Sequence, residues 1–213
     1  QIVKCININT MKQLIYIMMA AAALVLTAGE ASAQMGKRDY INAGWQFNGT
    51  VGNDFAKSAQ GYGAYMEGGY YVLPTLAVGG FASFNTNNQY VPEETYVFDD
   101  KSALTTDLSK SVYQVPFGVT VRYRFLWTEI QPYVEAKIGT EYSVQSTYMS
   151  TFVNRHDNWG FYISPEIGVT IFPFPQTDFG FQIAAYYSYA SNHNSSYDIT
   201  GINNLGFKLG VAF

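Results

Sequence analysis

Residues 113–125 read YQVPFGVTVRYRF, and their side chains alternate between apolar and polar or small from one end to the other. One face carries Tyr113, Val115, Phe117, Val119, Val121, Tyr123 and Phe125, and the other carries Gln114, Pro116, Gly118, Thr120, Arg122 and Arg124. Successive side chains of a β-strand point to opposite faces, so a period of two residues predicts a strand with one apolar face.

The same alternation recurs in seven other segments, and no window shows the 3.6-residue period of an amphipathic helix. The eight predicted strands are residues 41–48, 62–72, 76–84, 113–125, 134–144, 159–171, 179–189 and 205–213. A slip of one residue exchanges the two faces of a strand, so the sequence defines the face of each side chain better than it defines the strand ends.

The connections between these strands alternate in length. Three are short, at residues 73–75, 126–132 and 173–178, and four are longer and polar, at 51–60, 85–110, 145–158 and 190–204. Alternating short turns and long loops are typical of an antiparallel up-and-down barrel in an outer membrane, with the short turns in the periplasm. An even number of strands then brings both termini to the periplasmic side.

The composition excludes several other classes of protein. Only 13% of the 213 residues are charged, against about 25% in an average soluble domain, while 17% are aromatic. A disordered chain would be rich in charge and poor in aromatics. The single Cys excludes a disulfide scaffold and a multi-cysteine metal cluster, and the net charge of −4 argues against a nucleic-acid surface. No motif for a metal, phosphate or other cofactor is present, so none is expected.

The one long apolar run near the N-terminus has the features of a secretory signal peptide. Lys12 precedes the uncharged segment 14–26, and Ala31-Ser32-Ala33 has the small-x-small pattern of a cleavage site. A transmembrane helix is the alternative, but spanning a membrane takes about 20 apolar residues. We therefore assign residues 1–10 to an upstream extension without a structural role, 11–33 to the signal peptide and 34–213 to the barrel.

Three features favour a lipid-facing exterior over a soluble, lipocalin-like barrel, the competing architecture. No charged residue lies on the apolar faces, where a charge costs roughly 2–4 kcal/mol at the bilayer midplane. The opposite faces are rich in Gly and small polar residues, which suits the narrow lumen of about eight strands. Aromatic residues gather near the strand ends, as in interfacial girdles. The prediction is an all-β, eight-stranded antiparallel up-and-down transmembrane β-barrel after a cleavable signal peptide.

Eight charged side chains fall on the polar, lumen-facing side of the predicted strands. They are Glu67, Arg122, Arg124, Glu135, Lys137, Glu141, Glu166 and Lys208. Unpaired burial costs several kcal/mol per ion, so these four acids and four bases are expected to pair across the lumen. Their balance favours a plug of ion pairs, because a selective pore tends to show one dominant sign. The alternative is a narrow porin-like channel in which the pairs exchange partners.

With these features the chain resembles the eight-stranded outer-membrane barrel family of the OmpA and OmpX type, a porin-like barrel domain. The resemblance covers residues 41–213 and includes a last strand with alternate hydrophobic residues, Phe207, Leu209, Val211 and Phe213. In that family, a C-terminal strand of this kind is the signal that the barrel-assembly machinery recognises.

The resemblance implies a monomeric, non-enzymatic protein of the Gram-negative outer membrane, with a role in envelope integrity, surface adhesion or low-level permeation. It also implies lipid and lipopolysaccharide as neighbours, periplasmic chaperones during biogenesis, and no nucleic-acid partner.

Two further features of the sequence leave other roles open. His193-Asn194-Ser195 resembles the His-x-Ser pair of lipid A deacylase barrels, in which a base activates a hydroxyl. The last strand, however, has no acid to orient His193, and Asp198 is the one carboxylate nearby. The long polar segment 85–110 is either a solvated loop or a surface for an extracellular ligand. Its candidate recognition residues are Tyr90, Glu93, Glu94, Tyr96, Asp99 and Asp100.

Overall fold

The computed structural model describes residues 38–51, 60–99, 102–149, 152–174, 177–192 and 201–213. In these ranges the chain forms eight strands: β1 (Asp39–Thr50), β2 (Gln60–Tyr71), β3 (Leu76–Asp99), β4 (Ser102–Arg124), β5 (Ile130–Met149), β6 (Phe152–Ile171), β7 (Gly180–Ala190) and β8 (Ile202–Ala212). Among the described residues, no helix is long and apolar enough to cross a membrane. The assignments of residues 1–10 and 11–33 lie outside the described part of the chain.

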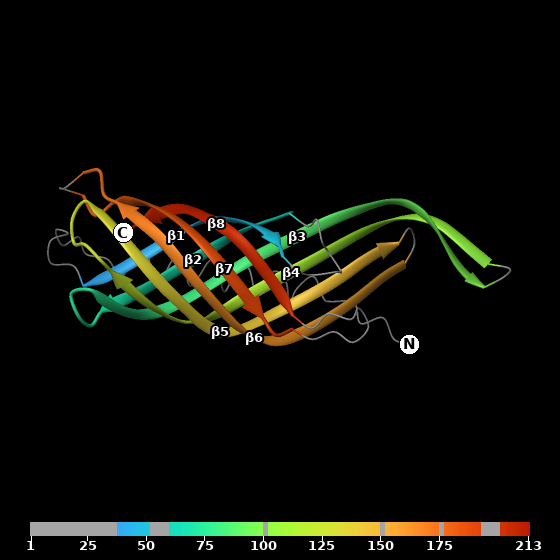
Figure 1. Ribbon diagram of the computed structural model, residues 1–213, viewed down its shortest axis with the longest axis horizontal. Coiled ribbons are helices and arrows are strands. Elements are labelled where there is room, and N and C mark those ends of the chain that lie inside the picture. The colour runs from blue at the N-terminus through green and yellow to red at the C-terminus, as the bar shows by residue number, and fades with distance from the viewer. Residues whose placement is uncertain (1–37, 52–59, 100–101, 150–151, 175–176, 193–200) are drawn as a thin grey trace, which may run out of the picture. The chain divides into compact units, whose positions relative to one another are not determined.

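Each strand pairs with its sequence neighbours, and the sheet closes where β1 pairs with β8 (Figure 1). All of the pairings are antiparallel; at the closure, Gly44 of β1 lies opposite Gly210 of β8. The predicted eight-stranded antiparallel up-and-down barrel is therefore confirmed, and closure leaves no unpaired sheet edge around its wall.

Side chains alternate between the lumen and the exterior on every strand, with the faces that the sequence predicts. On β1, Trp45 is 67% exposed and its neighbour Gln46 is 1% exposed; on β6, Ile167 is 64% exposed and Glu166 is 4% exposed. The interior is thus polar and the exterior of the barrel carries an apolar band, the reverse of a soluble protein. This distribution matches a barrel surrounded by lipid.

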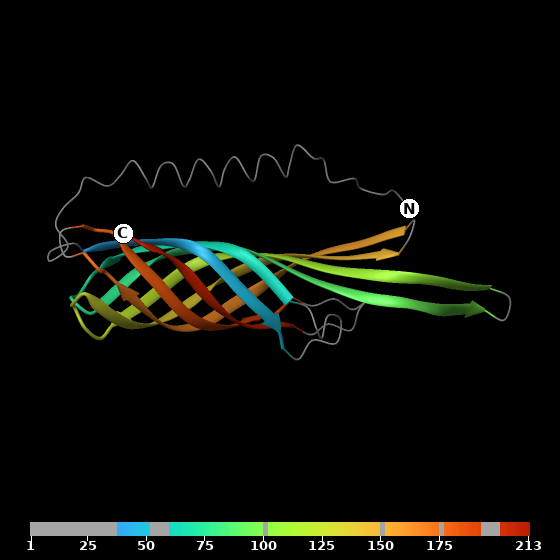
Figure 2. The ribbon, with the colours of Figure 1, turned by 90° about the horizontal axis from the view of Figure 1, so that it is seen from above.

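Two segments predicted as polar loops, 85–110 and 145–158, are instead largely strand. In both the β3–β4 and the β5–β6 hairpins, the antiparallel ladder continues to the last described residues before the turn. Figure 2 shows both hairpins extending past the ends of the other strands. Apolar alternation ends where a strand leaves the lipid, but hydrogen bonding between two polar strands continues, so the sequence pattern underestimated their length.

Two lumen-facing glycines allow a close approach of neighbouring strands. Gly118 of β4 and Gly139 of β5 lie directly opposite each other. A Cβ atom on Gly118 would collide with the carbonyl oxygen of Ile138, and one on Gly139 would collide with that of Phe117. Glycine is therefore required at this pair by the space available in the wall of the barrel.

Candidate functional site

Six charged side chains from five strands meet inside the barrel, and we call them the six-charge cluster. Each lies at a lumen-facing position, and none is more than 5% exposed as a side chain. The members are Glu67 (β2), Arg122 (β4), Glu135 and Lys137 (β5), Glu166 (β6) and Lys208 (β8). Three acids and three bases make the cluster neutral as a whole.

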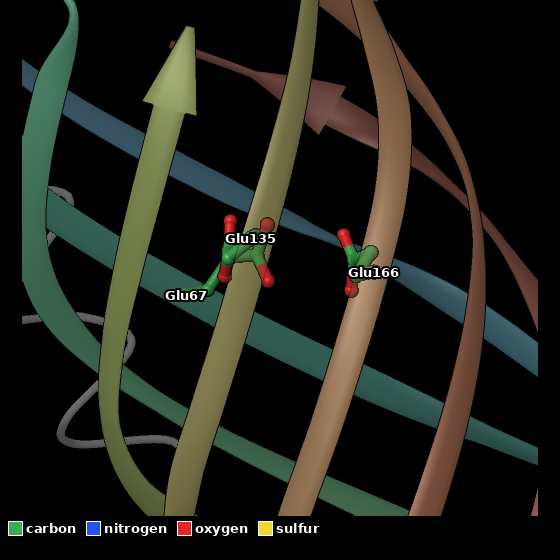
Figure 3. Close-up of side chains that lie close together, drawn as sticks. All are labelled: Glu67, Glu135 and Glu166. Atoms are coloured by element: carbon green, nitrogen blue, oxygen red, sulfur yellow. The ribbon is translucent and has the colours of Figure 1, made fainter.

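Lys137 is the centre of this cluster. Its Nζ atom lies 2.5 Å from Glu166 Oε2, 2.6 Å from Glu67 Oε2 and 3.2 Å from Glu135 Oε1. Figure 3 shows the three carboxylates converging from three strands, and their oxygens lie within 4.8 Å of one another. Three such carboxylates are the one group among the described residues that resembles a metal site. The ammonium of Lys137 already supplies a cation with one N–H for each of them.

Arg122 joins two of the same carboxylates from the other side. Its Nη2 lies 2.5 Å from Glu67 Oε1, and its Nε lies 2.5 Å from Glu135 Oε2. The guanidinium carbon is 4.1 Å from the centre of the Tyr40 ring and 4.1 Å from that of Tyr133. The side chain is therefore held both by charge and by two aromatic faces, an arrangement suited to the planar guanidinium.

Lys208 and two neutral side chains complete the hydrogen bonding of the cluster. Lys208 Nζ lies 2.7 Å from Glu166 Oε2, and the Tyr133 hydroxyl donates to Glu166 Oε1 at 2.8 Å. Gln182 Nε2 donates to Glu67 Oε1 at 2.8 Å, and it also contacts the Tyr133 hydroxyl. A buried charged network of this kind is stable only when its members are satisfied, and these bonds supply partners from several strands.

Two of the eight predicted lumen charges lie apart from the cluster. Arg124 is two residues beyond Arg122 on β4, and Glu141 is four residues beyond Lys137 on β5. At about 3.3 Å per residue these offsets are about 7 and 13 Å along the strand, so neither side chain reaches the six-charge cluster. The predicted network of eight is therefore a cluster of six, with one base displaced toward the short turns and one acid toward the long hairpins.

Glu141 is 1% exposed and makes no ion pair with any described residue. Its Oε1 atom has no hydrogen-bond partner within the described ranges. The Nδ2 group of the nearby Asn192 donates one hydrogen bond to Ser143 Oγ at 2.6 Å and one to the backbone oxygen of Glu141 at 3.5 Å. It does not donate to the Glu141 carboxylate.

Amide side chains fill the lumen on the long-hairpin side of the cluster. Gln46 Nε2 donates to Asn85 Oδ1 at 2.7 Å, Asn87 Nδ2 donates to Asn204 Oδ1 at 3.0 Å, and Asn204 Nδ2 donates to Gln114 Oε1 at 3.0 Å. An apolar group adds to this filling, formed by Phe81, Val112, Tyr162, Ala190 and Ile202. None of these residues is among the site residues predicted from the sequence, although a lumen-facing position combined with Asn or Gln is a signal that points to the amide side chains.

Of the candidate residues outside the predicted strands, the structure describes the side chain of Tyr90 alone. Tyr90 on β3 is 65% exposed. Glu93, Glu94, Tyr96 and Asp99 also belong to β3, but their side chains, like Asp100 as a whole, lie outside what the structure describes. His193, Ser195 and Asp198 also lie outside the described residues.

The residues predicted to form a C-terminal assembly signal face outward on the last strand. Phe207 is 50% exposed and Leu209 is 42% exposed. The Phe207 ring stacks on Phe47 with centroids 5.1 Å apart, and Phe213 meets Phe179 at 5.8 Å. Val211, between them, lies opposite Ala43 and Phe181. These residues form part of the apolar exterior where β8 closes the barrel.

Comparisons with known proteins agree with this architecture. A family described as "Outer membrane protein beta-barrel domain" matches residues 18–213. No curated protein matches the chain. The neisserial surface protein A barrel is similar over 82% of this chain and 95% of its own, with 13% identity and a TM-score of 0.50. The outer membrane protease OmpT of Escherichia coli is similar over 83% of this chain and 78% of its own, with 10% identity and a TM-score of 0.51.

A third solved structure, the attachment invasion locus protein Ail of Yersinia pestis, has 16% identity and a TM-score of 0.47, over 83% of this chain and 99% of its own. At such identities the likeness shows the fold alone. The similar folds include both a surface protein and a protease, so architecture by itself does not decide whether a barrel of this kind is an enzyme.

Proposed function

The chain belongs to the outer membrane protein beta-barrel domain family, and from that premise we propose that it is a non-enzymatic barrel that serves envelope structure and surface interaction or adhesion. The family and the lipid-facing exterior locate it in the outer membrane of a Gram-negative cell. The proposal for its role rests above all on one observation, the neutral six-charge cluster that crosses the lumen.

The six-charge cluster supports a closed barrel rather than a channel. An ion passing along the lumen would have to separate pairs such as Arg122–Glu67 and Lys208–Glu166, which are buried and 2.5 and 2.7 Å long. Removing one partner from a buried pair costs about 3–5 kcal/mol, so spontaneous opening is rare. The cluster also lacks the dominant sign of charge that a selective pore uses.

The two long hairpins support the surface role. Beyond the apolar band, outward side chains on these strands become polar, including the exposed Asn88, Arg155 and Asp157. We infer that the hairpins project from the cell, because long connections of such barrels are extracellular and short turns are periplasmic. Both termini then lie in the periplasm, and β8 presents Phe207, Leu209, Val211 and Phe213 for assembly.

A planar-bilayer recording tests the closed lumen. We expect the purified barrel to insert without stable conductance steps. Insertion is checked independently with brominated lipids, which should quench Trp45 and Trp159, because these side chains are 67% and 63% exposed on the outer wall. Quenching together with large stable conductance steps would show an open lumen and refute the proposal.

The surface role is tested by shortening one hairpin at a time. Asn88 and Ser111 are directly paired across β3 and β4, so a tight turn can join them and remove the rest of that hairpin. Ser143 and Asn158 offer the equivalent junction on β5 and β6, so each truncation is the matched control for the other. We expect one of the two truncations to reduce adhesion of expressing cells. Adhesion unchanged by both would exclude the hairpins as the interaction surface.

A further inference from the structure

The short-turn end of the lumen holds a small cavity next to a buried guanidinium. The cavity is about 30 Å³ and is lined by Tyr71, Arg124, Trp127 and Gln131, among others. Arg124 is 5% exposed, and its guanidinium carbon lies 3.8 Å from the centre of the Tyr71 ring and 4.3 Å from that of Trp127. The two rings cover the faces of the guanidinium and leave its edge for hydrogen bonding.

The hydrogen bonds of Arg124 use only part of that edge. Nη1 donates to the amide oxygen of Gln131 at 2.9 Å, and Nη2 donates to the backbone oxygen of Pro74 at 3.0 Å. Nε is buried and has no hydrogen-bond partner among the residues that the structure describes. A guanidinium has five N–H groups in a planar fork, so the Nε edge retains an unused donor in the geometry that carboxylates occupy.

The charge of Arg124 also lacks a counterion within the described part of the chain. The other three lumen bases, Arg122, Lys137 and Lys208, each lie within 4 Å of a carboxylate, whereas Arg124 bonds only neutral oxygens. A buried cation without a partner is costly, so the site gains from any anion that reaches it.

A second unpaired donor lines the same cavity. The hydroxyl of Tyr40 is buried, and no described residue forms a hydrogen bond with it. The one acidic side chain among the residues that line the cavity belongs to Asp39, which is exposed and makes no ion pair with either arginine. The cavity thus combines a positive charge with two unused donors from two strands, β1 and β4.

We propose that this cavity is a binding site for a carboxylate that enters from the short-turn end of the barrel. The two carboxylate oxygens accept from the Nε and Nη groups of Arg124, and the Tyr40 hydroxyl is the further donor in the cavity. A planar carboxylate fits between the Tyr71 and Trp127 rings in the plane of the guanidinium. A tetrahedral phosphate does not fit this slot as well, because it places oxygens above and below that plane.

The arginine side-chain Nε–H signals of the full barrel in micelles test the site directly. The chain contains four arginines, Arg38, Arg122, Arg124 and Arg155, so each signal can be assigned by substitution. Sodium acetate is titrated against sodium chloride at constant ionic strength. We expect a saturable shift of the Arg124 signal in the millimolar range, with smaller changes at the other three. A linear change, or a larger shift at Arg38, would overturn the proposal.

Two further arms separate carboxylate binding from general attraction of anions. Inorganic phosphate at the same ionic strength should give a much weaker saturable shift of Arg124; equal or tighter binding of phosphate would refute the assignment to carboxylate. Asp39→Asn should leave the Arg124 signal unchanged before acetate is added. A clear shift in that variant would show that Asp39 is the counterion in solution, and the site would then be an internal ion pair.

Substitutions at Arg124 provide an independent readout. In a background with Trp45→Phe and Trp159→Phe, fluorescence reports on Trp127 alone, because the chain has three tryptophans. Arg124→Lys keeps the charge and removes the planar fork, and it should weaken acetate binding by about tenfold or more, a factor that corresponds to about 1.4 kcal/mol. Unchanged affinity in Arg124→Lys would show that the fork is not the binding group.

Discussion

Replacing Lys137 with Met tests whether the six-charge cluster stabilises the barrel as a unit. The substitution keeps an unbranched side chain of similar length and removes the ammonium that lies 2.5, 2.6 and 3.2 Å from three carboxylates. Three acids then face two bases, and one buried negative charge is uncompensated. Removing one partner from a buried ion pair costs about 3–5 kcal/mol. We expect Lys137→Met to lower the free energy of unfolding by that amount.

A second substitution should reverse part of this loss. In Lys137→Met/Glu135→Gln the cluster is neutral again, and two pairs remain, Arg122–Glu67 at 2.5 Å and Lys208–Glu166 at 2.7 Å. Members of one network typically couple by about 0.5–3 kcal/mol. We expect the double variant to be more stable than Lys137→Met alone by an amount in the upper part of that range, although Glu135→Gln is destabilising by itself.

Urea titration of the barrel in phospholipid vesicles, followed by tryptophan fluorescence and by gel mobility, measures these differences. Arg155→Met is the matched control, because Arg155 is exposed near the end of the β5–β6 hairpin; its effect should stay within about 0.5 kcal/mol. A double variant whose loss equals or exceeds the sum of the two single losses would contradict the coupling. The cluster would then be a set of independent contacts.

Four further substitutions test other parts of the structure by the same titration. Glu141→Gln should leave stability unchanged or raise it, because it removes a buried carboxylate without a cation partner; Glu135→Ala should instead destabilise, and equal losses in the two would refute the distinction. Val119→Arg should cost about 2–4 kcal/mol in vesicles, since Val119 is 59% exposed on the lipid-facing wall; a neutral effect would contradict lipid contact there. Gly118→Ala should cost about 1–3 kcal/mol, because its Cβ would collide with the Ile138 carbonyl oxygen.

Period-two alternation carries most of the information about this fold. Where the sequence alternates, parity alone assigned the side chains of the eight predicted strands to the lumen or to the lipid. The lumen position of Gln46 and the exterior position of Trp45 follow from that parity, and so does the inward direction of all eight predicted charges. The physical reason is that the boundary between lipid and lumen acts on every side chain of every strand.

Alternation carries no information about the position of a side chain along the barrel axis. For this reason the sequence did not predict which lumen charges lie close together. Arg124 and Glu141 have the same parity as Arg122 and Lys137, but the staggering of strands places them on other rungs. The offset between neighbouring strands is a property of the closed barrel and of its shear, which no local pattern contains. The extended hairpins were missed for a related reason, since outside the lipid both faces of a strand are polar.

The six-charge cluster supplies the information about register that parity lacks. A slip of β5 by one residue would turn Glu135 and Lys137 toward lipid, at about 2–4 kcal/mol for Lys at the midplane, so alternation already excludes it. A slip by two residues keeps every face and moves Lys137 by about 7 Å, which breaks all three of its contacts and leaves Arg122 and Glu166 short of partners. The cluster therefore distinguishes the native register from its two-residue neighbours. A variant with all six charges replaced by neutral side chains should still form barrels, but as a mixture of registers that gives several sets of amide signals; a single set identical in pattern to the native one would refute this role.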